Sequence, residues 1–125
     1  MARTKSPTLT EAELRLMEVL WDRGPSTVGD VLQALPKRLG LAYSTVLTTL
    51  RILERKGYLR HKKAGRAFVY APRVDRGAAR RSTIRYLVSR FFDGSHGSLV
   101  MNVLENEELT PEELARLRRM IAESE

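Results

Sequence analysis

The feature that most constrains the fold is a change in the spacing of apolar residues just after Gly57. Before that glycine, apolar residues recur every three or four positions, which is the period of an amphipathic helix. After it, the segments 58–62 and 66–70 have the period of two that is typical of half-buried strands. Gly65 lies between these segments, where a tight hairpin needs a residue with positive φ. The sequence therefore predicts helices followed by a β-hairpin.

Three helices are predicted ahead of the hairpin. Thr10 and Glu13 form a capping box that begins the first helix, and Gly24 ends it. Thr27 with Asp30 is predicted to cap a shorter second helix that ends near Pro36, and the segment K-R-L-G-L after it is predicted as a loop. The third is predicted over 43–56, and its buried face is expected to contain the residues Tyr43, Val46, Leu50 and Leu53.

Three helices followed by a hairpin is the order of a winged helix-turn-helix domain. The sequence thus predicts a mainly α fold with a small β-hairpin. The winged-helix domain is assigned to residues 9–72, after a flexible N-terminus at residues 1–8. Residues 73–125 contain three further helical segments and are assigned to a helical dimerisation domain. Gly94 and Gly97 bracket a predicted break after the first of these segments, and Thr110 with Glu113 forms a second capping box that begins the last.

The C-terminal helices are too short to build a large closed core by themselves. Their apolar stripe therefore needs a partner surface, which could be the winged-helix domain of the same chain or a second copy. We favour a second copy, which gives a two-fold dimer. The residues predicted to form this dimer are Ile84, Leu87, Val88, Phe91, Leu99, Val100, Val103, Leu104, Leu114, Leu117 and Ile121.

Charge is unevenly distributed along the chain, whose formal net charge is +7. Residues 37–90 contain 15 basic and 2 acidic residues, whereas residues 91–125 contain 3 basic and 8 acidic ones. Such a basic middle segment is typical of a surface that faces nucleic-acid phosphates. The alternative is an adaptor whose basic face binds RNA or an acidic protein.

The third predicted helix has short hydroxyl side chains followed by arginine, a pattern that suits base edges in the DNA major groove. An ordinary solvated helix face is the alternative, although three threonines are poor helix formers. The DNA-contacting residues predicted on this helix are Tyr43, Ser44, Thr45, Leu47, Thr48 and Arg51.

The hairpin is rich in positive charge, which is expected to contact phosphates and so position the protein on DNA. Protection of an exposed sheet edge by lysines is the other explanation. The predicted phosphate-contacting residues of the hairpin are Arg60, Lys62, Lys63 and Arg66.

Catalysis and metal binding have little support in the sequence. The chain has no cysteine and only two histidines, so no metal or cofactor site is expected. Ser95 and His96 are neighbours, but no nucleophile-elbow pattern surrounds them, and we expect no enzymatic activity. No signal segment or membrane-length apolar run is present, which favours a cytoplasmic protein with no membrane insertion.

The chain resembles the BlaI/MecI-type penicillinase repressors, a family of bacterial transcriptional repressors. The resemblance is carried by L-T-E-A-E-L-R-L-M-E-V-L-W, T-V-L-T-T-L-R-I-L-E-R-K-G-Y-L, G-R-A-F-V-Y-A-P and G-S-L-V-M-N-V-L-E-N-E-E-L. It implies a homodimer that binds a palindromic operator, commonly with TACA/TGTA half-sites, and blocks transcription. It also implies release by cleavage in the dimerisation region, initiated by a membrane-bound sensor with metalloprotease activity. The matching bond is Asn102–Val103.

Two residues of the third helix depart from the family pattern. Leu47 stands where a basic or polar residue is usual, and Ile52 stands where an arginine is usual. Leu47 would favour apolar contact with a thymine methyl over a hydrogen bond. Val103 likewise replaces the aromatic residue that follows the asparagine in the staphylococcal-type proteins.

Overall fold

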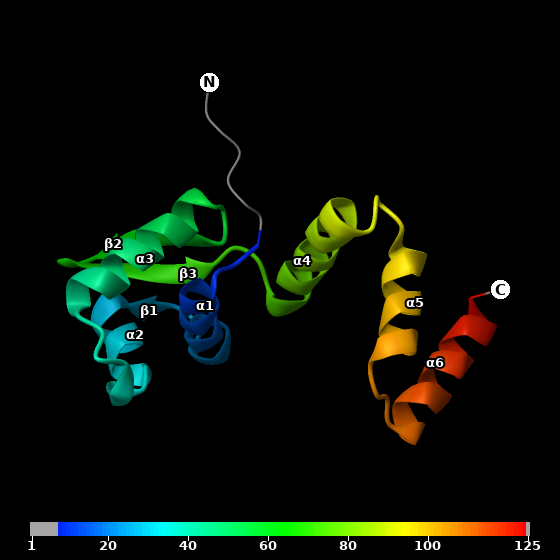
Figure 1. Cartoon of the computed structure of the whole chain (residues 1–125). Helices are drawn as coiled ribbons and strands as arrows, with labels where there is room; N and C mark the ends of the chain where they lie inside the picture. Colours follow the sequence, from blue (N-terminus) through cyan, green and yellow to red (C-terminus); the bar gives the residue numbers. More distant parts are fainter. Residues whose placement is uncertain (1–7, 125) are drawn as a thin grey trace. The chain divides into compact units, whose positions relative to one another are not determined.

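The computed structural model describes residues 8–124, in which six α-helices, one 3-10 helix and three short strands follow one another (Figure 1). The chain divides into two compact units, and each is described by itself. Unit 1 extends to Tyr86, and unit 2 begins at Leu87. The predicted flexible N-terminus, 1–8, lies outside the described residues except for Thr8. The assignment of 73–125 as a dimerisation domain stays a prediction.

The first two helices of unit 1 begin where their capping residues predict. In α1 (Glu11–Arg23), the Glu13 N–H donates to Thr10 Oγ1 at 3.1 Å, and the Thr10 N–H donates to Glu13 Oε1 at 2.9 Å. The same reciprocal box, built from Thr27 and Asp30, begins α2 (Val28–Ala34). The backbone hydrogen bond from Thr27 lowers the pKa of the Asp30 carboxyl below its ordinary 3.8. These capping predictions are confirmed.

A short 3-10 helix and then α3 follow. The 3-10 helix, Lys37–Leu39, falls in a segment predicted as a loop, and Gly40 ends it with φ 60°. The third predicted helix is confirmed as α3 (Tyr43–Arg55), one residue shorter than expected.

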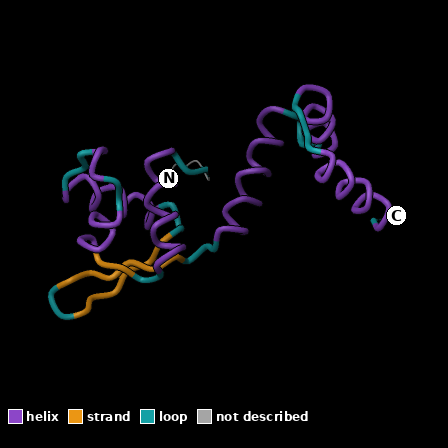
Figure 2. The backbone as a smooth tube through the Cα atoms, turned by 90° about the horizontal axis from the view of Figure 1, so that it is seen from below, coloured by secondary structure: helices purple, strands orange, loops and turns teal. Residues whose placement is uncertain are grey.

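The predicted hairpin is confirmed, and a third strand joins it (Figure 2). β2 (Leu59–Ala64) pairs antiparallel with β3 (Ala67–Pro72), from Leu59 opposite Pro72 to Ala64 opposite Ala67. Gly65, with φ +63°, lies in the turn. β1 (Ser26–Thr27) pairs with the other edge of β3, so the strand order is β1-β3-β2. A strand of two residues is too short to show a sequence period.

The core of unit 1 joins all three helices to the sheet. Tyr43, which was expected to be buried, is 54% exposed, so that expectation is wrong. It is the first residue of α3, and helical side chains tilt toward the N-terminus, so no preceding turn of α3 covers it. The largest fully buried side chains of this core are Leu16, Met17, Leu20, Val31, Val46, Leu50, Leu53, Leu59 and Tyr70.

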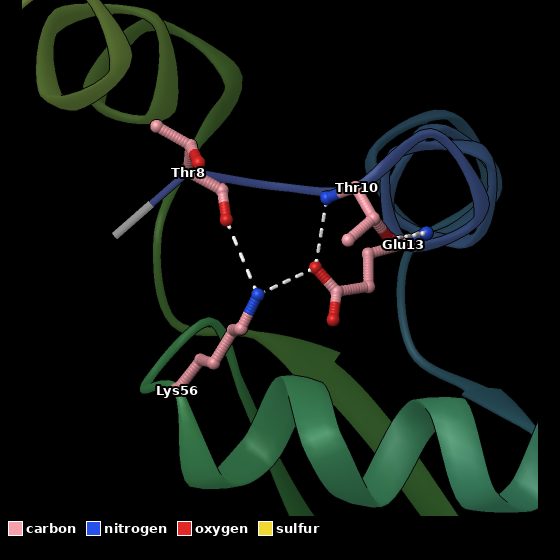
Figure 3. A network of polar contacts seen from close by, with 4 residues as sticks. All are labelled: Thr8, Thr10, Glu13 and Lys56. Carbon is pink, nitrogen blue, oxygen red and sulfur yellow. Dashed lines mark hydrogen bonds and ion pairs between the residues drawn. The ribbon is translucent and has the colours of Figure 1, made fainter. Parts of the chain in front are cut away.

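A buried ion pair holds the C-terminal end of α3 against the start of α1 (Figure 3). Lys56 Nζ lies 2.7 Å from Glu13 Oε1 and donates to the Thr8 carbonyl oxygen at 3.2 Å. Burial alone would raise the pKa of Glu13. Hydrogen bonds from Lys56 and Thr10 outweigh that effect, and the pKa lies below its ordinary 4.5. The capping box of α1 is thus also the anchor of α3.

The first part of α4 (Arg76–Phe91) belongs to unit 1 and is attached to α1 through Trp21. The Trp21 indole Nε1 donates to the carbonyl oxygen of Val74 at 2.9 Å. Arg76 lies over the same indole at 5.2 Å and donates to Asp22 at 3.1 Å. Ala79, one turn further, is buried in the core. The beginning of α4 is therefore fixed by polar and apolar contacts within unit 1.

Unit 2 contains the end of α4, α5 (His96–Asn106) and α6 (Pro111–Glu123). The predicted second capping box, Thr110 with Glu113, begins α6 and is confirmed. Gly97, expected at a helix break, instead lies inside α5, because the Ser95 hydroxyl caps the helix ahead of it. Among the described residues from 87 onward, Val88 alone is buried, and α5 and α6 bury none.

Candidate nucleic-acid interface

One face of α3 packs into the core, and the face opposite it is exposed. The exposed positions include five of the six predicted residues of this helix: Tyr43, Ser44, Thr45, Thr48 and Arg51. Leu47, the sixth, is half-buried and packs against the core. The Thr49 hydroxyl donates to the Thr45 carbonyl oxygen at 2.9 Å, so its hydrogen bond is made within the helix.

The hairpin of β2 and β3, which we call the wing, exposes its predicted positive charges. Arg60, Lys62, Lys63 and Arg66 are all exposed. β2 is also an edge strand of the sheet, so its lysines protect that edge as well. Strand residues alternate between the two faces of a sheet, and the charges therefore occupy both faces of the wing. Such an arrangement can reach phosphates on either side of the hairpin.

A side-chain contact ties the exposed part of α3 to the wing. Glu54 on α3 lies 2.7 Å from His61 Nδ1 on β2, and the His61 ring packs on Phe68 and Tyr70. Burial raises the pKa of the Tyr70 hydroxyl on β3, the Glu54 carboxylate adds to that rise, and the positive charge of Arg51 opposes it. The helix face and the wing are therefore held in a fixed arrangement.

The sequence does not predict the contact between Glu54 and His61, which joins a helix to a strand across a turn. Glu54 did leave a signal. It is the one acidic residue between Lys37 and Val74, and an isolated acid in a basic segment calls for a neutralising neighbour.

The described residues give the other candidate sites no support. Ser95, considered as a nucleophile, caps α5 by accepting a hydrogen bond from the Ser98 N–H at 3.1 Å. Residues 8–124 contain no group of three His, Cys, Asp or Glu side chains placed to hold a metal ion. In that same range, no helix is long and apolar enough to cross a membrane.

The two units differ in net charge, and the exposed face of α3 and the wing lie in the positively charged unit. Residues 1–86 contain 18 Lys and Arg against 7 Asp and Glu, whereas residues 87–125 contain 4 against 8. The positive field is thus concentrated in the unit that presents α3 and the wing. A hydroxyl-rich helix beside a cationic hairpin defines a winged-helix protein of the nucleic-acid-binding class.

Comparison with known proteins gives the family. The sequence profile described as "Penicillinase repressor" matches residues 9–123. The chain is 34% identical over 119 residues to the penicillinase repressor of Bacillus licheniformis, covering 95% of this chain and 93% of the relative. It is 32% identical to the transcriptional regulator BlaI of Mycobacterium tuberculosis, covering 97% of this chain and 88% of the relative. The chain therefore belongs to the penicillinase repressor family.

Two solved structures resemble about three fifths of the chain. One is the DNA-binding domain of the repressor BlaI, at 36% identity and a TM-score of 0.53, covering 61% of this chain and 93% of that one. The other is monomeric Bacillus licheniformis BlaI in complex with the blaP half-operator. It has 36% identity and a TM-score of 0.50, and it covers 59% of this chain and 90% of that one.

Proposed function

We propose that this protein is a cytoplasmic transcriptional repressor whose homodimer binds a palindromic operator. The observation that carries the proposal is the exposed face of α3, rich in hydroxyls and joined to a wing with four exposed cations. Ser44, Thr45 and Thr48 read base edges in the major groove, and the wing contacts phosphates. The related BlaI bound to a half-operator supports the same use of this fold.

Unit 2 supports the dimer. Eleven or more residues in each of α5 and α6 bury no side chain within the chain, although both helices are amphipathic. Large apolar side chains such as Phe91, Met101 and Ile121 are more than half exposed. Exposed apolar surface of this kind is typical of a protein–protein interface. A second copy of unit 2 would cover it and would set the distance between two DNA-binding units.

Dimerisation also gives a means of control. Cleavage of the bond between Asn102 and Val103 by a membrane-bound sensor protease would remove part of α5 and all of α6 from the dimer. The bond lies inside α5, so the helix must open locally before a protease can reach it. Mass spectrometry of the repressor recovered from cells exposed to a β-lactam tests this step. Fragments 1–102 and 103–125 are expected, and derepression with an intact chain would contradict cleavage.

A matched pair of variants tests DNA reading. Thr45→Ala is expected to weaken binding to the operator more than binding to unrelated DNA, because it removes a contact to base edges. Lys62→Ala is expected to weaken both about equally and to lower the salt slope by roughly one unit, because it removes one phosphate contact. The operator is first located by footprinting purified protein on its own upstream region, and affinities are then measured across salt concentrations.

Comparing the two variants separates base reading from phosphate contact. Equal loss by Thr45→Ala on operator and unrelated DNA would contradict a base-reading role for α3. Tighter binding of duplex RNA than of DNA by the wild-type protein would favour the adaptor function instead.

A further inference from the structure

Unit 1 also contains a groove that lies outside the proposed DNA-binding face. It lies between α1 and the first half of α4 and has a volume of about 480 Å³. Leu14, 39% exposed, and Ile84, 44% exposed, line its apolar wall together with Trp21. Large apolar side chains that stay this exposed in a concave surface indicate that something covers them.

The charged residues that line the groove are Glu18, Arg76 and Arg80, so the lining carries one net positive charge. Arg76 is already engaged by Asp22 and by the Trp21 ring. Arg80 is exposed at the same groove, and no carboxylate of residues 8–124 forms an ion pair with it. An occupant with an apolar residue for the wall and carboxylates for Arg80 would complement both features.

The chain contains such a segment. Residues 105–113, which end α5 and begin α6, contain five glutamates and no lysine or arginine. Leu109 lies in the middle of this segment, and Glu107 and Glu108 beside it are exposed.

We propose that the groove between α1 and α4 of one copy receives the acidic segment 105–113 of a second copy. Leu109 packs against the apolar wall, and Glu107 and Glu108 lie near Arg80. The proposal rests on the dimer proposed above. It adds a specific contact between the two copies that lies outside the apolar faces of α5 and α6. In a two-fold dimer the contact occurs twice, so each charge change acts at both sites.

Charge reversal tests the contact in the full-length protein. Arg80→Glu is expected to raise the dimer dissociation constant about tenfold. At each of the two symmetric contacts, the glutamates of one copy then face a carboxylate instead of a guanidinium. The double variant Glu107→Lys/Glu108→Lys is expected to do the same from the other side. Arg55→Glu is the matched control, since it makes the same charge change at an exposed position outside the groove. Analytical ultracentrifugation gives the dissociation constants, and circular dichroism confirms that each variant is folded.

Mixing the two weakened variants is the decisive measurement. In the mixed dimer, the carboxylate introduced by Arg80→Glu in one copy meets the two lysines introduced in the other. At the second contact the unchanged Arg80 meets the unchanged glutamates, so both contacts are attractive again. We expect the mixed dimer to form more tightly than either variant alone and to exceed its statistical share in native mass spectrometry.

The remaining outcomes overturn the proposal in distinguishable ways. A mixture as weak as its components would show that the contact is not made between copies. If a single chain carrying all three changes then recovered wild-type stability, the segment would be binding its own groove. If the Arg80→Glu variant dimerised as tightly as the wild-type protein, the groove contact would be overturned but the dimer itself would not. A wild-type protein that stays monomeric would overturn the proposed dimer itself.

Discussion

At the scale of single residues, the ion pair between Glu13 and Lys56 can be tested by substitution. The Glu13 side chain is 7% exposed and the Lys56 side chain 10%, and together they join the start of α1 to the end of α3. Lys56→Met would leave the Glu13 carboxylate buried without its cation. We expect a loss of about 3 kcal/mol in the free energy of unfolding at pH 7. Urea unfolding followed by circular dichroism measures the loss, and a change no larger than that of an exposed lysine would contradict it.

The same pair predicts a pH dependence. The folded-state pKa of Glu13 lies below its ordinary 4.5, so the ionised carboxyl stabilises the fold above that pH. This contribution is lost as the pH falls through the folded-state pKa. Wild-type protein should therefore be more stable than Glu13→Gln at pH 7, and the difference should shrink below pH 4.5. Glu11→Gln is the control, because Glu11 is largely exposed and its variant should show little difference at either pH.

At the scale of secondary-structure elements, local signals specify the helix ends and tertiary contacts specify the site. Capping boxes at Thr10, Thr27 and Thr110 are encoded within four residues, and the sequence predicts all three helix starts. β1 has two residues and exists only because β3 offers its free edge, so no pattern in the sequence could predict it.

The exposed face of α3 is likewise only partly encoded locally. Its polar residues follow from helical periodicity, whereas the burial of Leu47 against the core and the contact of Glu54 with His61 depend on the packed neighbours. Tyr43 shows the limit of periodicity at a helix start. Its position matches the buried face, but the helix offers nothing ahead of it to cover the ring.

The beginning of α4 is the element whose attachment can be tested most directly. Trp21→Phe keeps an aromatic ring near Arg76 but removes the donor to the Val74 carbonyl oxygen. The expected loss in the free energy of unfolding is about 1–2 kcal/mol. Hydrogen exchange should also accelerate in the first turns of α4 beyond any change in α3, because the bond acts locally. Equal acceleration in both helices would show a general loss of stability instead.

At the scale of the whole molecule, the charge distribution differs between the two compact units, which agrees with a separate function for each. The unit that presents α3 and the wing carries the positive excess, and the other unit carries the acidic excess together with the uncovered apolar helices. A single winged-helix unit touches one half-site. The proposed dimer would add a second such unit at a fixed distance, so its operator binding should depend on the spacing of the half-sites.

That dependence can be measured on three DNA duplexes: the footprinted operator, one half-site alone, and the operator with about 5 bp inserted at its centre. We expect the operator to bind about 100-fold more tightly than one half-site, because the second unit binds at high effective concentration. The insertion turns the half-sites to opposite faces of the duplex, since one helical turn is about 10 bp. Affinity should then fall toward the single-site value. Equal affinity for all three duplexes would mean that each unit binds independently and that the dimer contributes nothing to operator recognition.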